Sequence, residues 1–221
     1  TVWFHTSIGA SVLMGFFSLY QLAGKALINQ GGVRVDGTFG NATYLAVYLL
    51  FHLFFVAYYA ARYWSLKWTR WVYAPIALLQ LFVLYHTATR GAILGLIGGA
   101  LLSALILAIR EPGFTRKMSA GFILSAIVFI GLFVSFRDST FIQKSPVLSR
   151  FANISPTEQT TTSRFTIWKM SYEGWKAHRL LGWGPENYNL VFSSYYKPEL
   201  WKQEPWFDRS HNVFFDLLIS S

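Results

Sequence analysis

Long apolar runs constrain this chain more than any other feature of its sequence. The runs that approach the length of a membrane span are about Val2–Leu22, Tyr44–Ala61, Trp71–His86, Gly91–Ile109 and Ala120–Phe136. A helix needs roughly 20 apolar residues to cross the hydrocarbon core of a bilayer. Another run begins near Val213 and reaches the end of the sequence. The pattern predicts an all-α fold, a polytopic bundle of transmembrane helices.

Composition supports a membrane protein and excludes several other classes. Of the 221 residues, 53% are hydrophobic and only 13% are charged, whereas an average soluble domain is about 25% charged. A soluble enzyme built around a single core is therefore excluded. The chain contains no cysteine, so it forms neither a disulfide framework nor a cysteine-ligated metal centre.

The formal net charge of +9 has two explanations in a membrane protein. Basic loops orient helices and contact anionic lipids, so the lipid bilayer is the expected partner and nucleic acid is not. The second explanation is that some of the arginines hold an anionic substrate.

The short loops predict the orientation of the helices. Arg62–Arg70 carries three basic residues and no acid, and Arg110–Met118 carries three basic residues and one acid. Short basic loops remain in the cytoplasm. The opposite, periplasmic side then receives residues 23–43, the turn Thr87–Arg90 and the long segment Arg137–Asn212.

We expect three parts in this chain, and we expect the chain to be a piece of a larger protein. Residues 1–136 form five transmembrane helices, residues 137–212 form a periplasmic loop that contains helices, and residues 213–221 begin a truncated transmembrane helix. No cleavable signal peptide is evident. A loop of this length is too long to be a mere connector.

Within the long loop, a Ser/Thr-rich stretch (Ser155–Ser163) precedes a helical pattern. Ser163 is the predicted cap of this helix. Aromatic side chains then follow at close to helical spacing: Phe165, Trp168, Tyr172 and Trp175. Such a stripe suits a helix that lies in the membrane interface.

Three arginines on the predicted periplasmic side are candidate anion-binding residues. Arg90 stands where a membrane helix begins, and Arg164 stands at the start of the loop helix. A helix N-terminus already carries partial positive charge, so a cation there is unfavourable unless an anion is shared. The alternatives are headgroup contact for Arg90 and a solvated surface position for Arg164. Arg34, in a glycine-rich loop, is the weaker third candidate.

His211 is the candidate general base, because histidine takes up a proton near neutral pH. The alternative is an interfacial histidine without a role. His86 is the next candidate, whereas His5 and His52 fall within membrane segments and His178 lies on the loop helix. No two histidines have metal-ligand spacing and no carboxylate cluster accompanies them, so no metal and no cofactor is expected.

Four short motifs occur in an order that resembles the O-antigen ligase and O-antigen polymerase superfamily. They are Thr89–Gly91 after an apolar helix, Ser163–Arg164 with Trp168, Gly182–Asn187, and His211–Asn212 before another helix. The segment Arg34–Asn41 resembles the stretch that precedes this pattern. The resemblance covers most of the chain, from about residue 31 to its end.

This resemblance implies a membrane glycosyltransferase of the GT-C type in the bacterial inner membrane. Family members transfer a glycan from undecaprenyl diphosphate to an acceptor hydroxyl on the periplasmic face, inverting the anomeric centre without a metal. Arg90 and Arg164 match the two arginines assigned to the donor diphosphate, Arg34 is a further substrate-binding candidate, and His211 matches the histidine thought to activate the acceptor. Such enzymes serve lipopolysaccharide and other polysaccharide biosynthesis.

The acceptor stays open among lipid A-core, a growing glycan and a protein hydroxyl. A protein O-oligosaccharyltransferase of the same superfamily is therefore one alternative. A polysaccharide or lipid transporter is another, although transporters place polar groups at the bilayer midplane on broken helices. A purely structural membrane subunit would leave the periplasmic arginines unexplained.

Overall fold

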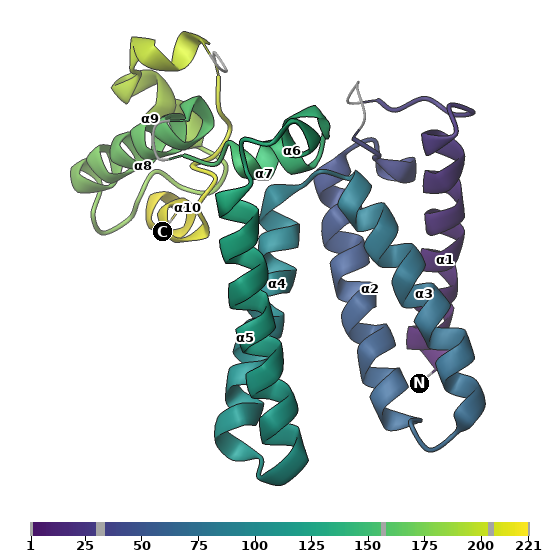
Figure 1. The fold of residues 1–221 in the computed structure, drawn as a ribbon. Helices are drawn as coiled ribbons and strands as arrows, with labels where there is room; N and C mark the ends of the chain where they lie inside the picture. The colour runs from purple at the N-terminus through teal and green to yellow at the C-terminus, as the bar shows by residue number, and fades with distance from the viewer. Residues whose placement is uncertain (1, 30–33, 156–157, 203–205, 221) are drawn as a thin grey trace. The chain divides into compact units, whose positions relative to one another are not determined.

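The computed structural model describes residues 2–29, 34–155, 158–202 and 206–220, and within these ranges its secondary structure is entirely helical (Figure 1). The chain divides into two compact units, Thr1–Ala152 and Asn153–Ser221. The predicted all-α polytopic fold class is confirmed. Gly31–Val33 of the glycine-rich loop and Pro156–Thr157 of the Ser/Thr-rich stretch lie outside the described residues.

The first unit contains five long helices followed by two short ones. They are α1 (Val2–Leu22), α2 (Ala42–Arg62), α3 (Lys67–His86), α4 (Arg90–Arg110), α5 (Gly113–Ser135), α6 (Thr140–Lys144) and α7 (Leu148–Ala152). Among the described helices, α1, α2, α4 and α5 are long and apolar enough to cross a membrane. α3 is of similar length but less apolar, and it packs against α1 and α2. A fifth membrane span at α3 therefore stays a prediction.

Two loops are shorter in the structure than the sequence predicts. α3 begins at Lys67 rather than at Trp71, and α5 begins at Gly113 rather than near Ala120. Hydrophobicity marks the part of a helix that meets lipid, whereas lysine and arginine extend its ends because they are good helix formers whose charged ends reach water. The basic residues thus flank the α2–α3 and α4–α5 turns, which lie at one end of the unit, opposite the α3–α4 turn (Figure 1).

Polar side chains join the first three helices inside their apolar contact surfaces. The His52 Nε2 and Ser7 Oγ atoms are 2.7 Å apart, and Gln80 Nε2 donates to Ser11 Oγ at 2.7 Å. Gln80 is fully buried. Such interhelical hydrogen bonds hold membrane helices together, since lipid provides no hydrophobic force between them.

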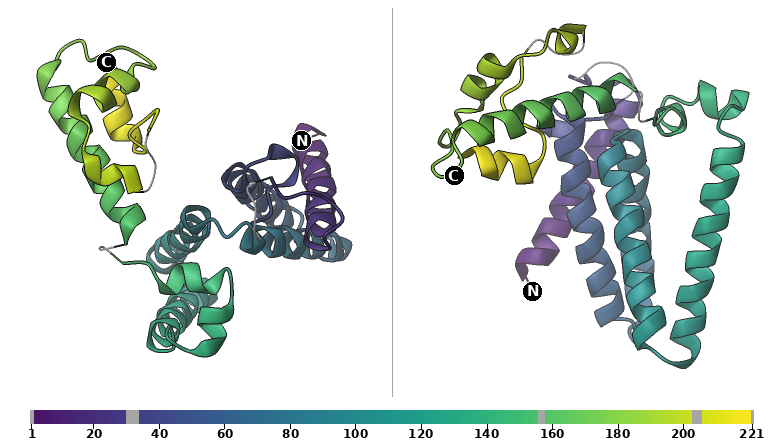
Figure 2. Two further views of the ribbon diagram at one scale, coloured as in Figure 1. Left: turned by 90° about the horizontal axis from the view of Figure 1, so that it is seen from above. Right: turned by 90° about the vertical axis from the view of Figure 1, so that its left-hand side faces the viewer.

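The second unit is a small helical assembly with its own apolar core. It contains α8 (Gln159–Ala177), α9 (Tyr188–Tyr195), the 3-10 helix η2 (Pro198–Lys202) and α10 (Val213–Ser220). Figure 2 shows α10 lying alongside α8. The core brings together Ile167, Met170, Val191, Leu200 and Ile219.

The predicted start of the loop helix is wrong. α8 begins at Gln159, and Ser163 is a buried residue of its second turn rather than its cap. The end of the Ser/Thr-rich stretch is helical from Gln159 on, and threonine hydroxyls in this part of α8 bond the helix's own carbonyl groups. Thr162 Oγ1 donates to Gln159 O at 3.0 Å, and Thr166 Oγ1 donates to Thr162 O at 3.1 Å. Arg164 therefore lies inside the helix, not at its N-terminus.

Candidate functional site

The turn between α3 and α4 positions Arg90 as the first residue of α4. Thr87 is buried and its hydroxyl donates to Leu84 O at 2.7 Å, which closes the end of α3. Ala88 is buried with a φ of 49°, a left-handed conformation that is uncommon for a residue with a Cβ. Arg90 is half-buried and its Nε atom is shielded from solvent. The sequence prediction of a tight turn that presents Arg90 at a helix start is confirmed.

Arg34 lies on this same turn, although 53 residues separate it from Thr87. Its Nε donates to Thr87 O at 3.1 Å, and its Nη2 donates to Thr89 Oγ1 at 3.3 Å. The neighbouring Val35 is fully buried and its amide donates to His86 O at 3.1 Å. The structure thus brings two of the predicted arginines, Arg34 and Arg90, to one end of the first unit.

A buried polar cluster holds the Arg34 loop in place. The Asp36 carboxylate is fully buried and accepts from Gln21 Nε2 at 2.8 Å and from the Asn29 amide at 2.7 Å. Gly37 has a φ of 59°, and a Cβ there would meet Met14 Sδ at 2.8 Å, so only glycine fits without strain. Asp36 and Gly37 of the Arg34–Asn41 motif therefore support the fold, and the Arg34 guanidinium bonds the α3–α4 turn.

Arg150, on the short helix α7, is a residue that sequence reasoning missed. Burial lowers the pKa of Arg34, and the positive charge of Arg150 lowers it further. The Tyr85 hydroxyl lies 3.5 Å from Ser145 Oγ, which ties the α6–α7 segment to the end of α3. Nothing in the local sequence around Arg150 distinguishes it from a surface arginine.

In the second unit, α8 carries Arg164 on an exposed position. One turn further along the same face, Trp168 Nε1 donates to Ser210 O at 3.2 Å, and its ring stacks on Phe215 with centroids 6.2 Å apart. Residues four apart on a helix are neighbours, with Cβ atoms about 5–6 Å apart. Arg164 therefore lies near the segment that contains His211.

His211 follows the carbonyl that Trp168 holds, and its own backbone has a φ of 54°. Its imidazole is exposed, lies edge-on to Phe207 with centroids 5.5 Å apart, and forms no hydrogen bond within the described ranges. The segment is fixed by Ser210, whose amide and hydroxyl both donate to Asp216 Oδ1 at 2.7 Å. A rigid backbone thus presents an accessible imidazole.

The Gly182–Asn187 motif fastens the second unit together. The Trp183 amide donates to Ile219 O at 2.6 Å, and its indole donates to Gly174 O at 2.9 Å. Asn187 Nδ2 donates to Trp183 O at 2.8 Å. The glycines at both sides of Trp183 have positive φ. This motif joins α8, α9 and α10, and its conformation explains its composition without a ligand.

A family model described as O-antigen ligase matches residues 75–221, which is more than half of the chain. The chain belongs to the O-antigen ligase family. No curated protein and no solved structure matches it. The O-antigen ligase match includes Arg90, Arg164 and His211 but begins after Arg34, so Arg34 enters the site through its contact with the α3–α4 turn.

Membership in the O-antigen ligase family makes this a multi-pass membrane protein of the ligase or polymerase type, which acts on glycan and lipid-linked substrates. Arg34 and Arg90 lie in the first unit, and Arg164 and His211 lie in the second. The two residues of each pair belong to one unit. That the two pairs meet at one substrate stays a prediction.

Three other histidines, His5, His52 and His178, lie beside aromatic or polar groups of the fold. The His5 Nε2 atom lies 3.0 Å from the Tyr73 hydroxyl, and His52 Nδ1 lies 2.7 Å from Tyr48 O. His178 is exposed beside the Trp183 ring, with centroids 4.4 Å apart. Across the described part of the chain, no group of three histidine, aspartate or glutamate residues could hold a metal ion.

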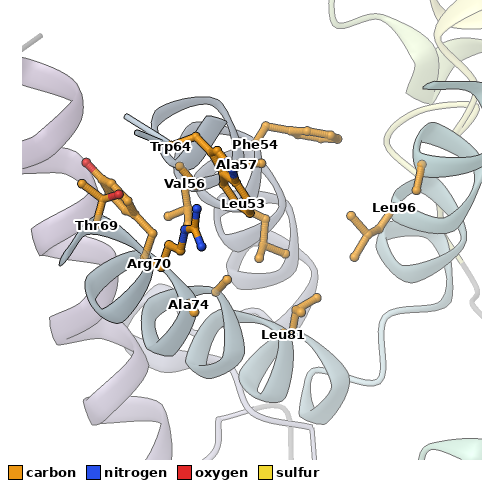
Figure 3. A pocket seen from close by; sticks show the side chains of 14 residues that line it. Leu53, Phe54, Val56, Ala57, Trp64, Thr69, Arg70, Ala74, Leu81 and Leu96 are labelled. Atoms are coloured by element: carbon orange, nitrogen blue, oxygen red, sulfur yellow. The ribbon is translucent and has the colours of Figure 1, made fainter. Parts of the chain in front are cut away.

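The surface of the described residues has two grooves of similar volume. A mostly apolar groove of about 550 Å³ lies between α2, α3 and α4 (Figure 3), and Thr69, Arg70 and Tyr73 are among its lining residues. The Arg70 guanidinium lies 4.2 Å from the centre of the Trp64 ring. The lining of this groove offers no chemistry. A second groove of about 490 Å³, in the second unit, is lined by polar side chains that include Glu186, Asn189, Asp208 and Arg209, as well as Trp206.

Proposed function

We propose that this chain forms the catalytic part of a membrane glycosyltransferase that moves a glycan from undecaprenyl diphosphate to an acceptor hydroxyl at the periplasmic face of the bacterial inner membrane. The observation that carries the proposal is the family match together with the position of Arg34 and Arg90. Both lie at the end of the first unit opposite the basic α2–α3 and α4–α5 turns. Basic turns of this kind are cytoplasmic.

The arginines suit a donor whose leaving group is a lipid diphosphate. Negative charge on that group grows as the glycosidic bond breaks, and a fixed guanidinium stabilises it through paired hydrogen bonds. Arg90 and Arg34 would hold the diphosphate, and Arg164 would add a third cation. Arg164 is exposed, and within the described residues it has no ion-pair or hydrogen-bond partner, which leaves all its donors for a ligand. This assignment requires no metal.

His211 would act as the general base that takes the proton of the attacking hydroxyl. Its exposed imidazole and its fixed backbone suit this role. Attack from the side opposite the diphosphate inverts the anomeric centre. The polar groove beside the same segment, with Asp208 and Trp206 in its lining, provides hydrogen-bonding groups and an aromatic face for a sugar acceptor.

The proposed mechanism requires the two units to close on one donor. A structure of the full-length protein with a donor analogue tests this requirement. Arg90 and Arg164 more than roughly 20 Å apart in that complex would exclude a shared diphosphate, because both guanidinium groups must reach it.

The competing functions differ in their acceptor or in their class. Lipid A-core, a growing glycan and a protein serine or threonine all present a hydroxyl, so ligase, polymerase and protein O-oligosaccharyltransferase share this chemistry. A transporter would place its polar groups at the bilayer midplane on broken helices. Here Arg34 lies in the loop before α2 and bonds the α3–α4 turn, and Arg90 lies at the start of α4, which favours the enzyme.

Transfer by the full-length protein in vesicles tests the proposal directly. The assay offers an undecaprenyl-diphosphate-linked glycan with each acceptor class in turn, with and without a chelator. Arg90→Lys keeps the positive charge but loses the planar guanidinium that can bond two phosphate oxygens at once, so it should lose most of the transfer activity. Arg164→Ala should lose about 10²–10³-fold. His211→Ala should keep donor binding and lose about 10²–10⁴-fold in turnover. Equal transfer by all three variants and the parent would refute the assignment, and inhibition by the chelator would refute metal independence.

Single-cysteine labelling tests the orientation, since this chain has no cysteine of its own. Ser65→Cys lies in the α2–α3 turn and Ser194→Cys lies in α9, and both positions are exposed. In intact spheroplasts, an impermeant maleimide should label position 194 and not position 65. The reverse pattern would place the arginines in the cytoplasm and overturn the site.

A further inference from the structure

Two adjacent leucines, Leu180 and Leu181, project from the turn that follows α8. Their side chains are 92% and 86% exposed, and Leu180 is the most exposed large hydrophobic residue in the described part of the chain. Single exposed apolar residues are common on protein surfaces, whereas apolar residues that adjoin one another and are bordered by polar groups mark an interaction site. The family match and the proposed catalytic residues give these leucines no role.

The turn that carries the leucines is fixed by hydrogen bonds on both sides. The Gly182 amide donates to His178 O at 3.0 Å, and Gly182 has a φ of 56°, a conformation that favours glycine. The Trp183 indole donates to Gly174 O at 2.9 Å. Because the backbone is held at each end of the turn, the leucines stay on the outside of the unit and do not fold back into its core.

Cations that rest on aromatic rings lie just before the leucines in the sequence. Lys176 Nζ lies 5.1 Å from the centre of the Tyr172 ring, and the Arg179 guanidinium lies 5.8 Å from the centre of the Trp175 ring. Lys176 Nζ is also 2.7 Å from Glu173 Oε2. Aromatic rings gather at the headgroup level of a bilayer, and lysine and arginine there contact anionic headgroups. The end of α8 thus combines the side chains of a membrane interface with two leucines that suit the hydrocarbon beneath it.

The turn is also attached to α10, which the sequence predicts to enter the membrane. The Trp183 amide donates to Ile219 O at 2.6 Å, near the end of α10. Trp168 stacks on Phe215, and further along both helices a Cβ at Gly174 would lie 3.5 Å from Ile219 Cδ1. These contacts occur in the same order along both helices, so α8 and α10 run in the same direction. The leucine turn therefore lies on the side toward which α10 extends.

We propose that the Leu180–Leu181 turn inserts into a bilayer that contains anionic phospholipid, with both leucines among the acyl chains and with Lys176 and Arg179 at the headgroups. A multi-pass membrane protein has this partner beside it. Burial of one leucine side chain favours the inserted state by about 10- to 100-fold. Insertion fixes the depth of α8 relative to the membrane surface. The proposal does not depend on the catalytic roles proposed above.

Fluorescence quenching in proteoliposomes tests the insertion. Leu181→Cys and, for comparison, Ser194→Cys at an exposed position of α9 are introduced singly into the full-length protein without other cysteines and labelled with the fluorophore NBD. Phospholipids with a doxyl group on the acyl chain quench a label in hydrocarbon, and iodide on both sides of the vesicle membrane quenches a label in water. We expect doxyl lipid to quench the label at position 181 and iodide to leave it bright, with the reverse at position 194.

Two results of this experiment would overturn the proposal. Equal quenching by iodide at positions 181 and 194 would leave the leucines in water. Protection of position 181 from both quenchers would show that another segment of protein, and not lipid, covers the turn.

A polar substitution at the neighbouring leucine separates insertion from an effect of the label. With the label at position 181, Leu180→Ser should raise the ratio of water-exposed to inserted turn by at least about tenfold. Leu190→Ser is the matched control, since Leu190 is an exposed leucine of α9, and it should leave the ratio unchanged. A ratio in Leu180→Ser equal to that of the parent would also overturn the proposal.

Vesicles with and without phosphatidylglycerol test the headgroup contact. Each lysine or arginine near an anionic membrane surface strengthens binding by about fivefold. Phosphatidylglycerol should therefore raise the inserted population of Leu180→Ser, and this gain should be lost when Lys176→Gln and Arg179→Gln are added. The same gain with and without the two cations would overturn the headgroup contact.

Discussion

Gly174 lets α8 and α9 approach more closely than a residue with a Cβ atom would allow. Its substitution therefore tests the packing of these two helices in the second unit. A Cβ at this position would lie 2.5 Å from Val191 Cγ1 and 3.5 Å from Ile219 Cδ1. Val191 is fully buried and lies within α9. Because a β-branched side chain in a helix has one strongly preferred rotamer, the valine cannot turn away. Gly174→Ala must therefore separate the helices or strain the valine.

Two opposing effects set the size of the loss. Overpacking a buried contact costs about 1–3 kcal/mol, whereas replacing glycine by alanine inside a helix gains about 1 kcal/mol. Because the clash is severe, the cost of overpacking exceeds the gain in helix propensity. We expect Gly174→Ala to lower the free energy of unfolding by about 1–2 kcal/mol. For a unit of this size that loss lowers Tm by about 4–16 °C. The indole of Trp183, which donates to Gly174 O, would be displaced as well.

The assay is thermal unfolding of the full-length protein in detergent, followed by tryptophan fluorescence. Gly95→Ala in α4 is the control, because no atom lies within 4 Å of the added Cβ; it should not lower Tm. Val191→Ala alone loses two methyl groups and should cost about 2 kcal/mol. In the double variant Gly174→Ala/Val191→Ala the new methyl occupies the vacated space, so the loss should be smaller than the sum of the single losses. Additive losses, or a Gly174→Ala variant as stable as the parent, would refute the close approach of α8 and α9.

Three further predictions follow from single hydrogen bonds and from one shifted pKa. Asp36→Asn should cost about 2 kcal/mol in thermal unfolding and weaken donor binding, because the buried carboxylate accepts from Gln21 and Asn29; unchanged stability would contradict the role given to the Arg34 loop. Burial raises the pKa of Tyr188 to about 12. The contribution of Tyr188 to the free energy of unfolding is therefore complete below about pH 10, the pKa of a tyrosine in the unfolded chain, and is lost as the pH rises through 12. In an alkaline titration followed by circular dichroism, Tyr188→Phe should therefore unfold at higher pH than the parent. Unfolding of both proteins at the same pH would contradict this prediction. Trp168→Phe removes the bond to Ser210 O while an aromatic ring remains beside Phe215, so turnover should fall with donor affinity unchanged; a parallel fall in affinity would show that Trp168 acts on the donor instead.

The helices could be predicted from sequence because lipid exposure requires apolar side chains over a fixed length. The same signal failed at helix ends. Lys67, Arg70, Arg116 and Lys117 belong to helices, but their charges resemble those of a loop. The start of α8 was missed for a related reason, since its serine and threonine hydroxyls bond the helix's own carbonyl groups and so permit a helix where composition indicates a cap.

The sequence could predict a candidate site residue only where a local motif marked it. Arg90 follows a turn that is visible in the sequence, and the contact of Arg34 with that turn is consistent with the substrate-binding prediction. Arg150 had no such signal. The α6–α7 segment that carries it reaches the end of α3 through the Tyr85–Ser145 contact, and a contact between distant segments leaves no mark in the residues around either partner.

The structure also separates motif residues that serve the fold from those available to a substrate. Trp183, Asn187 and Asp36 have their polar groups occupied by hydrogen bonds within the chain, which accounts for their presence without any ligand. Arg164 and His211 are exposed, and within the ranges described here their side chains bond no other group. Polar groups that the fold does not use, held on a backbone that it fixes firmly, are what a preorganised site requires, because their interactions are then reserved for the reacting groups. By this criterion Arg164 and His211 are among the exposed groups of the second unit that the fold does not use, and their roles in catalysis stay predictions.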